Sequence, residues 1–262
     1  MASYEHIKLS LQSGVATILL NRPEKGNALN TKLVTELLDA AAVCSRGAAV
    51  RAVLLTGAGR AFCVGGDLAE FAAAGESGIA PLIKDLVANL HRALVLFAEM
   101  RPLLVVAVNG AAAGAGLGLA LAGDHVIAAE NARFKMAYTA AGVTPDGGTT
   151  YFLPRLIGLR RTQELVYTNR SLTAADALQL GMVTQIVADR DLETQAMAMC
   201  QTFARGPSEA CGAAKKLLLG TFQHSLREHL SHEEDEIAVA AVSLDGIEGV
   251  RAFVENRAPT FS

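Results

Sequence analysis

The sequence has few cysteines, no excess of basic residues and no long apolar run free of charges. Its four cysteines, Cys44, Cys63, Cys200 and Cys211, are scattered without a CxxC pair, so neither a zinc site nor a redox motif is indicated. The 23 Lys and Arg against 26 Asp and Glu give a formal net charge of −3, which provides no positive field for nucleic acid. We therefore expect buried thiols in a reducing compartment and no nucleic-acid partner.

Signals for export or membrane insertion are also missing from the sequence. The opening MASYEHIKLS lacks the basic segment and the apolar core of a signal peptide. No uncharged apolar run reaches the roughly 18 residues that a membrane span needs. These absences predict a cytoplasmic protein without a membrane partner. With 262 residues, of which 51% are hydrophobic and 19% charged, the chain can form one α/β domain or two small ones.

Apolar periodicity predicts alternating strands and helices over the first two thirds of the chain. Ile7, Leu9 and Leu11 alternate with polar residues and precede VATILL, which predicts a hairpin, and Thr31 is expected to cap a helix ending at Arg46. Further strands are expected at 50–57, 103–110, 124–129 and 182–187, and helices at 81–100, 111–123, 159–168, 173–180 and through most of 192–253. Without Pro/Ser linkers, this order predicts an α/β body over 1–190 followed by a helical region over 191–262.

Two glycine-rich loops follow buried strands. They are RAFCVGGDL, residues 60–68, and AVNGAAAGAGLG, residues 107–118. A helix that starts in such a loop offers unpaired N–H groups, and two loops that each supply one N–H would form an oxyanion hole for a thioester. Two tight turns without any binding role are an equally good interpretation. The run GAGLG does not complete a GxGxxG dinucleotide motif.

Six stretches of the chain resemble the enoyl-CoA hydratase/isomerase (crotonase) superfamily, in the same order and over nearly the whole length. They are NRPEKGNALN, AFCVGGDL, AVNGAAAGAGLGLALAGD, ARFKMAYTAAGVTPDGGTTYFLPRLIG, LTAADALQLGMVTQIV and EGVRAFVENRAPTF. The resemblance implies an α/β fold with a ββα spiral core and a helical C-terminal trimerisation region. It also implies a homotrimer or a dimer of trimers that acts on acyl-CoA thioesters.

The same resemblance assigns roles to individual residues. The two oxyanion-hole donors fall on the backbone N–H groups of Gly66 and Ala115. Coenzyme A contacts fall on Arg22, Lys25 and Ala28. The resemblance also assigns Arg257 to the coenzyme A site of a neighbouring subunit. No separate cofactor is implied, because coenzyme A enters as part of the substrate.

Two positions depart from the hydratases of this family. Hydratases carry one glutamate in the helix after the second oxyanion donor and another just before the GxxPGxGGT segment, where this sequence has Gly118 and Tyr138. Hydration needs one group to activate water and another to handle the α-carbon proton. Because neither residue replaces a glutamate well, ordinary hydration is disfavoured.

A carboxylate stands instead at Asp146, in the pattern GxxPDxGG. That pattern resembles enoyl-CoA isomerases related to those of phenylacetate breakdown, in which the matching aspartate shuttles a proton between carbons of the acyl chain. Desolvation in an acyl pocket raises the pKa of a carboxylate toward the range where it serves as base and then as acid. The alternative interpretation is that Asp146 caps a helix beginning at Gly147.

Other assignments remain open from the sequence. His91 matches a catalytic histidine of 4-chlorobenzoyl-CoA dehalogenases, which would make Asp146 a nucleophile and His91 the base that hydrolyses the ester, with an aromatic residue at Tyr138. A half-buried histidine without a catalytic role is the simpler reading. A member that keeps acyl-CoA binding without catalysis is a third possibility. His229 and His232 are expected on a solvated helix face, so no metal site is predicted.

Overall fold

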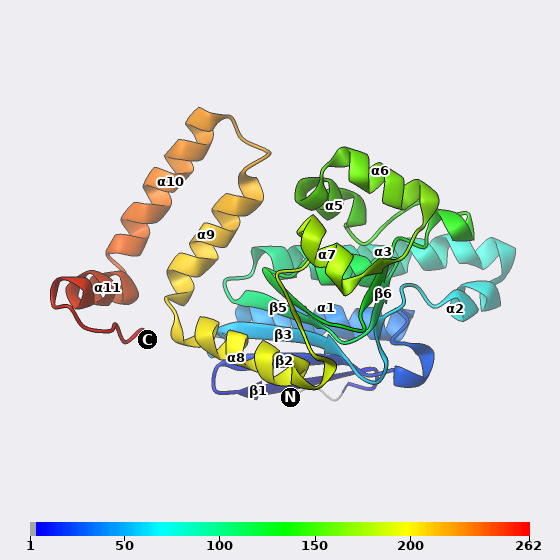
Figure 1. Ribbon diagram of the computed structural model, residues 1–262, viewed down its shortest axis with the longest axis horizontal. Coiled ribbons are helices and arrows are strands. Elements are labelled where there is room, and N and C mark those ends of the chain that lie inside the picture. The colour runs from blue at the N-terminus through cyan, green and yellow to red at the C-terminus, as the bar shows by residue number, and fades with distance from the viewer. Residues whose placement is uncertain (1–3) are drawn as a thin grey trace.

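The computed structural model of the chain describes residues 4–262, which form two β-sheets surrounded by helices (Figure 1). The larger sheet has the strand order β1-β2-β3-β5-β7-β10, and the smaller has the order β4-β6-β8-β9. The strands are β1 (Ile7–Gln12), β2 (Val15–Leu20), β3 (Ala52–Gly57), β4 (Ala61–Cys63), β5 (Leu103–Val108), β6 (Ala111–Ala113), β7 (His125–Ala129), β8 (Arg133–Lys135), β9 (Leu172–Thr173) and β10 (Gln185–Val187).

Helices cover both sheets and continue beyond them at the C-terminus. The α-helices are α1 (Thr31–Arg46), α2 (Leu68–Ala73), α3 (Gly75–Glu99), α4 (Ala115–Leu121), α5 (Thr149–Ile157), α6 (Leu159–Thr168), α7 (Ala174–Leu180), α8 (Leu192–Arg205), α9 (Ser208–Gly220), α10 (Leu226–Ala241) and α11 (Leu244–Val254). Short 3-10 helices are η1 (Pro23–Lys25), η2 (Thr139–Ala141) and η3 (Asp189–Asp191). None of the helices within residues 4–262 is both long and apolar enough to cross a membrane.

The larger sheet is buried on both faces. Successive strand residues point to opposite sides, so Val53 and Leu55 pack into the main core with α1 and α3, while Ala52 and Leu54 face α8. The side chains of α8 that complete this second cluster include Ala196 and Cys200. Burial on both faces explains why the parallel strands read as continuous apolar runs in the sequence.

The smaller sheet brings three separate loops to one edge. Strand β6 pairs in parallel with β4 on one side and with β8 on the other. The carboxyl ends of parallel strands meet at the same edge of a sheet. The segments that follow these strands carry Gly66, Ala115 and Tyr138, so three residues far apart in the sequence leave the sheet side by side.

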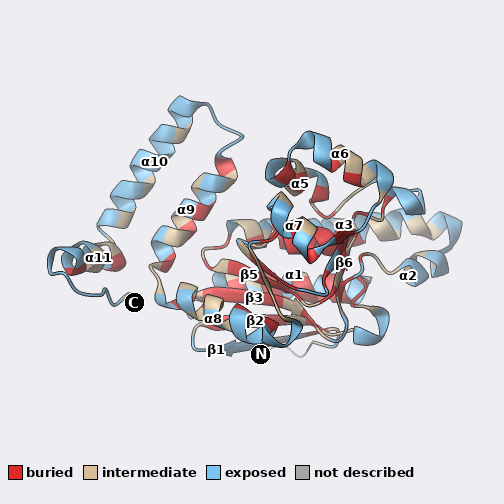
Figure 2. Cartoon of the chain, in the orientation of Figure 1, coloured by how far each residue is buried: buried red, intermediate tan, exposed pale blue. Residues whose placement is uncertain are grey.

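Helices α10 and α11 stand apart from the sheets (Figure 1) and are largely exposed (Figure 2), whereas α9 contacts α3 and strand β5. Helix α8, by contrast, is packed against the larger sheet. The division of the chain at residue 191 stays a prediction.

Several predicted boundaries are wrong for local reasons. Asn30 rather than Thr31 caps α1, because its side chain accepts the N–H of Leu33. Helix α3 begins at Gly75, six residues before the predicted start. The predicted helix at 111–123 is divided into the short strand β6 and helix α4.

Three cysteines are buried free thiols as expected, whereas Cys211 is only half-buried.

Candidate active site

Asp146 lies in the turn before α5, and its carboxylate accepts a hydrogen bond from a buried phenol. The Tyr138 hydroxyl donates to Oδ1 of Asp146 at 2.6 Å, and Tyr138 is only 8% exposed. The capping alternative is wrong, because the residue at the N-cap of α5 is Gly148 and no side chain caps the helix. Thr149 donates to the backbone carbonyl of Asp146 instead. The carboxylate is therefore free to face the cavity.

The surroundings of Asp146 shift its pKa upward. Burial raises the pKa of the Asp146 carboxyl above its ordinary value, and the Tyr138 hydrogen bond and the nearby His91 lower it only in part. Burial and the Asp146 charge also raise the pKa of Tyr138, so its phenol stays protonated and remains the donor. A carboxylate with a raised pKa can take up a proton and release it again near neutral pH.

Removal of the Tyr138 hydroxyl tests this arrangement. In Tyr138→Phe the carboxylate loses a donor that favours its charged form, so the pKa of Asp146 rises further. Because the base must be ionised, activity is lost as pH falls through this pKa. We therefore expect the acidic limb of the kcat/KM profile to move to higher pH.

The control for this substitution is Tyr167→Phe, which removes a phenol that is 73% exposed on α6. Its pH profile should match that of the unchanged protein. An acidic limb in Tyr138→Phe that stays in place or moves to lower pH would contradict the role of the hydrogen bond.

His91 lies next to Asp146 on α3 and supports the turn that carries it. Its Nε2 accepts the backbone N–H of Gly147 at 3.3 Å. The lone pair of that nitrogen is therefore directed at the backbone. In this geometry His91 orients the turn after Asp146.

The turn after Asp146 occupies the space where a side chain at position 118 would lie. A Cβ atom built on Gly118 would overlap the carbonyl oxygen of Gly147. Gly147 itself has φ +58° and comes so near to α4 that its own Cβ would lie 3.1 Å from Cα of Ala115. Only glycine at both positions permits this approach, which brings Asp146 beside the start of α4.

Gly66 and Ala115 each present a backbone N–H at the shared edge of the smaller sheet. Gly66 forms a parallel bridge with Leu29, in which Leu29 bonds to the carbonyl of Gly65 and to the N–H of Asp67. This pairing directs the N–H of Gly66 itself away from Leu29. Ala115 is the first residue of α4, where no intrahelical acceptor exists for its N–H. The two groups can therefore both serve a ligand oxygen.

The predicted coenzyme A contacts lie on the Gly66 side. Arg22 donates to the Ala28 carbonyl at 2.6 Å and to the Asp67 carboxylate at 2.9 Å. Burial alone would raise the pKa of Asp67, but the Arg22 hydrogen bond and two backbone donors bring it below the ordinary value. Arg22 thus ties this segment to the loop of Gly66, while Lys25 is exposed beside it.

Arg257 is not brought to this site within the single chain. It follows α11 and forms a two-pronged ion pair with Glu248, at 2.6 and 2.9 Å. His229 and His232 lie on α10, and no cluster of three potential metal-ligating side chains is found among the residues described.

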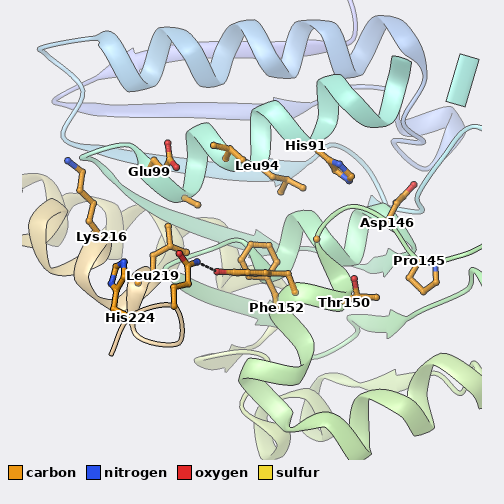
Figure 3. A pocket seen from close by; sticks show the side chains of 16 residues that line it. His91, Leu94, Glu99, Pro145, Asp146, Thr150, Phe152, Lys216, Leu219 and His224 are labelled. Carbon is orange, nitrogen blue, oxygen red and sulfur yellow. Dashed lines mark hydrogen bonds between the residues drawn. The ribbon is translucent and has the colours of Figure 1, made fainter. Parts of the chain in front are cut away.

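A cavity of about 900 Å³ opens beside Asp146 between α3, α5 and α9 (Figure 3). Its lining residues are His91, Leu94, Val95, Ala98, Glu99, Pro145, Asp146, Gly148, Thr150, Tyr151, Phe152, Lys216, Leu219, Gly220, Gln223 and His224. Of residues 68–97, only His91, Leu94 and Val95 line this cavity. The wall formed by α9 is not predicted by any motif in the sequence, although Lys216, Leu219 and Gly220 have the spacing of one helix face.

The chain is similar to known proteins over nearly its whole length. The family model described as Enoyl-CoA hydratase/isomerase matches residues 10–262. A protein of Rhodobacter capsulatus named "Probable enoyl-CoA hydratase" is 40% identical, with 99% of each chain covered. The 1,2-epoxyphenylacetyl-CoA isomerase of Escherichia coli K12 is 37% identical over 98% of each chain. A crystal structure of enoyl-CoA hydratase from Bacillus anthracis superposes with a TM-score of 0.92 at 32% identity, covering 98% of this chain and 99% of that one.

The residues that the family model matches include all the helices around the cavity. The α/β fold expected from the resemblance is confirmed. The chain belongs to the enoyl-CoA hydratase/isomerase family, the crotonase superfamily.

Proposed function

We propose that the protein is an enoyl-CoA double-bond isomerase in which Asp146 carries a proton between two carbons of the acyl chain. The observation that supports this most is the single carboxylate at the reactive end of the cavity. The Gly147 backbone fills the space beside Gly118, and Glu99 lies at the opposite end (Figure 3). Hydration requires a second acid–base group near the first.

The proposed reaction uses groups that surround Asp146. The N–H groups of Gly66 and Ala115 bind the thioester oxygen and stabilise the negative charge that develops there. Asp146 removes a proton from C2 of a 3-enoyl-CoA, the C2–H electron pair forms the new C2=C3 bond, and the former C3=C4 pair takes the same proton at C4. The product is the conjugated 2-enoyl thioester. The E. coli relative is an isomerase by name, whereas the R. capsulatus relative is named a hydratase.

The proposal is tested with a trans-3-enoyl-CoA, a trans-2-enoyl-CoA and 4-chlorobenzoyl-CoA, each followed by chromatography and mass spectrometry. An isomerase converts the first into its conjugated isomer with no change of mass. Addition of water to the second without isomerisation of the first would indicate a hydratase. Loss of chloride from the third would indicate a dehalogenase. Turnover of none of the three would indicate a protein that binds acyl-CoA without catalysis.

His91→Gln separates the isomerase from the dehalogenase. In an isomerase His91 only supports the turn at Gly147, so the rate should fall by less than about tenfold, which is below the usual contribution of a general base. In a dehalogenase His91 would activate water against an aspartyl ester, and the substitution would trap an aryl adduct on Asp146. Intact-protein mass spectrometry after exposure to 4-chlorobenzoyl-CoA detects that adduct, which would overturn the proposal.

We also propose that the chain forms a homotrimer or a dimer of trimers. The support is the family resemblance together with large apolar side chains exposed on the last three helices and the turns that join them. These side chains are Leu218, Phe222, Leu226, Leu230, Ile237, Val239, Val242, Leu244, Ile247, Val250, Phe253 and Val254. Many large apolar side chains exposed on a few neighbouring elements are typical of a protein interface.

A further inference from the structure

Charged side chains stand at the end of the cavity remote from Asp146, where the proposed isomerisation uses none. Figure 3 shows Lys216, His224 and Glu99 at that end, with Leu94 and Phe152 between them and the reactive end. The cavity therefore has a reactive end, an apolar middle and a polar far end. A purely apolar acyl chain that filled it would bring its terminus against the charged groups.

Helix α3 runs along the cavity from the reactive end to the polar end, so its rise per residue gives the distance between them. Five residues of α3 line the cavity at the spacing of one helix face, namely His91, Leu94, Val95, Ala98 and Glu99. Eight residues separate His91 from Glu99, which is about 12 Å at 1.5 Å per residue. An extended acyl chain of medium length, with its thioester held beside Asp146, would place its far carbon at the polar end.

A buried ion pair sets which face of α9 is turned to the cavity. Lys215 is 7% exposed, and its Nζ donates to the Phe97 carbonyl at 2.6 Å and to the Asp124 carboxylate at 2.7 Å. These bonds fix α9 against the end of α3 and the larger sheet. The next residue, Lys216, is consequently presented to the cavity together with Leu219.

Lys216 is available to a ligand. Within residues 4–262 its ammonium group forms no ion pair, and neither does Glu99 across the cavity from it. The amide of Gln223, by contrast, already donates to the Tyr151 hydroxyl at 3.0 Å. Lys216 is thus the uncommitted cation at the far end, with the His224 ring as a second polar group beside it.

We propose that Lys216 recognises a carboxylate at the far end of the acyl chain, so that the preferred substrates are medium-length 3-enoyl-CoAs carrying a terminal carboxyl group. The apolar middle accommodates the methylene groups, and the ammonium group of Lys216 receives the terminal charge. This inference rests on the proposed function, because it takes the thioester to be held beside Asp146.

The test uses saturated acyl-CoAs, which cannot isomerise and so report binding alone. Isothermal titration calorimetry compares a medium-length ω-carboxyacyl-CoA with its methyl ester, which has nearly the same length without the charge. We expect the carboxylate form to bind about fivefold more tightly, the upper range for an exposed ion pair. Lys216→Met should remove this preference. Lys84→Met, at an exposed position of α3 outside the cavity, should keep it.

The results distinguish this inference from the isomerase proposal. If neutral 3-enoyl-CoAs are isomerised while the two saturated ligands bind equally, the carboxylate site is wrong and the isomerase stands. A preference that is lost only in Lys216→Met, in a protein that isomerises nothing, supports the carboxylate site and rejects the isomerase. A preference that persists in Lys216→Met overturns the assignment of Lys216. Glu99→Gln removes a negative charge that would repel the ligand carboxylate, and should increase the preference for the carboxylate over its methyl ester.

Discussion

Asp146→Asn is expected to lower the turnover of a trans-3-enoyl-CoA by roughly 10² to 10⁴, the usual contribution of a positioned carboxylate to proton transfer. The amide keeps the shape of the side chain and an oxygen that accepts from the Tyr138 hydroxyl, so the turn should be preserved. It cannot accept the C2 proton. The loss should therefore appear in kcat, with little change in the binding of a saturated acyl-CoA.

The stability of the same variant gives a second readout. Burial holds the pKa of the native Asp146 carboxyl above its ordinary value, so ionisation of this group opposes folding. That penalty is absent below the unfolded-state pKa and appears as pH rises through the native pKa. At neutral pH Asp146→Asn should consequently melt at the same temperature as the unchanged protein or higher, as measured by circular dichroism.

Asp85→Asn is the matched control, since Asp85 is exposed on α3 and does not line the cavity. It should leave both turnover and melting temperature unchanged. Near-normal turnover in Asp146→Asn would remove Asp146 from the mechanism. A large drop in its melting temperature would instead show that the carboxylate is needed for the fold.

The sequence predicts the reactive end of the site better than the rest of the cavity. Asp146 stands out because it is a single charged residue in a run of glycines, threonines and apolar residues. Its partner Tyr138 stands where hydratases of the family have a glutamate, but no local pattern indicates that the Tyr138 hydroxyl and the Asp146 carboxylate meet at 2.6 Å. That contact depends on the path of the backbone between them, which is not encoded in a short motif.

The far end of the cavity could not be predicted for a different reason. Lys216 follows Lys215, and the pair reads as an ordinary solvated segment of a helix. The structure divides their roles, because Lys215 is buried against Asp124 and Lys216 faces the cavity. Which of two adjacent lysines is buried depends on how α9 docks on the sheet. Contacts between residues so far apart in the sequence leave no periodic signal.

Gly118→Ala is expected to lower both stability and activity, although alanine is the better helix former by about 1 kcal/mol. The added methyl group would overlap the Gly147 carbonyl oxygen, so the turn or α4 must shift. Overpacking of a buried site costs about 1–3 kcal/mol of the free energy of unfolding. A shift of about 1 Å in the turn, which also displaces Asp146, can reduce the rate by about 10²-fold.

The control for Gly118→Ala is Gly78→Ala in α3, where the added Cβ would meet only the Cβ of Ala74 at 3.4 Å. The same change of residue should there stabilise the protein, and urea unfolding compares the two directly. If Gly118→Ala were as stable and active as the unchanged protein, the close approach of Gly147 would not matter.

The expected clash also links the absence of a glutamate at position 118 to the placement of Asp146. A glutamate at position 118 requires the space that the Gly147 carbonyl now fills, so it cannot coexist with the present path of the turn. That same path places the carboxylate of Asp146 beside the start of α4. The absence of a side chain at position 118 and the placement of Asp146 therefore depend on the same backbone path, and Gly118→Glu alone should produce an unstable protein without hydratase activity.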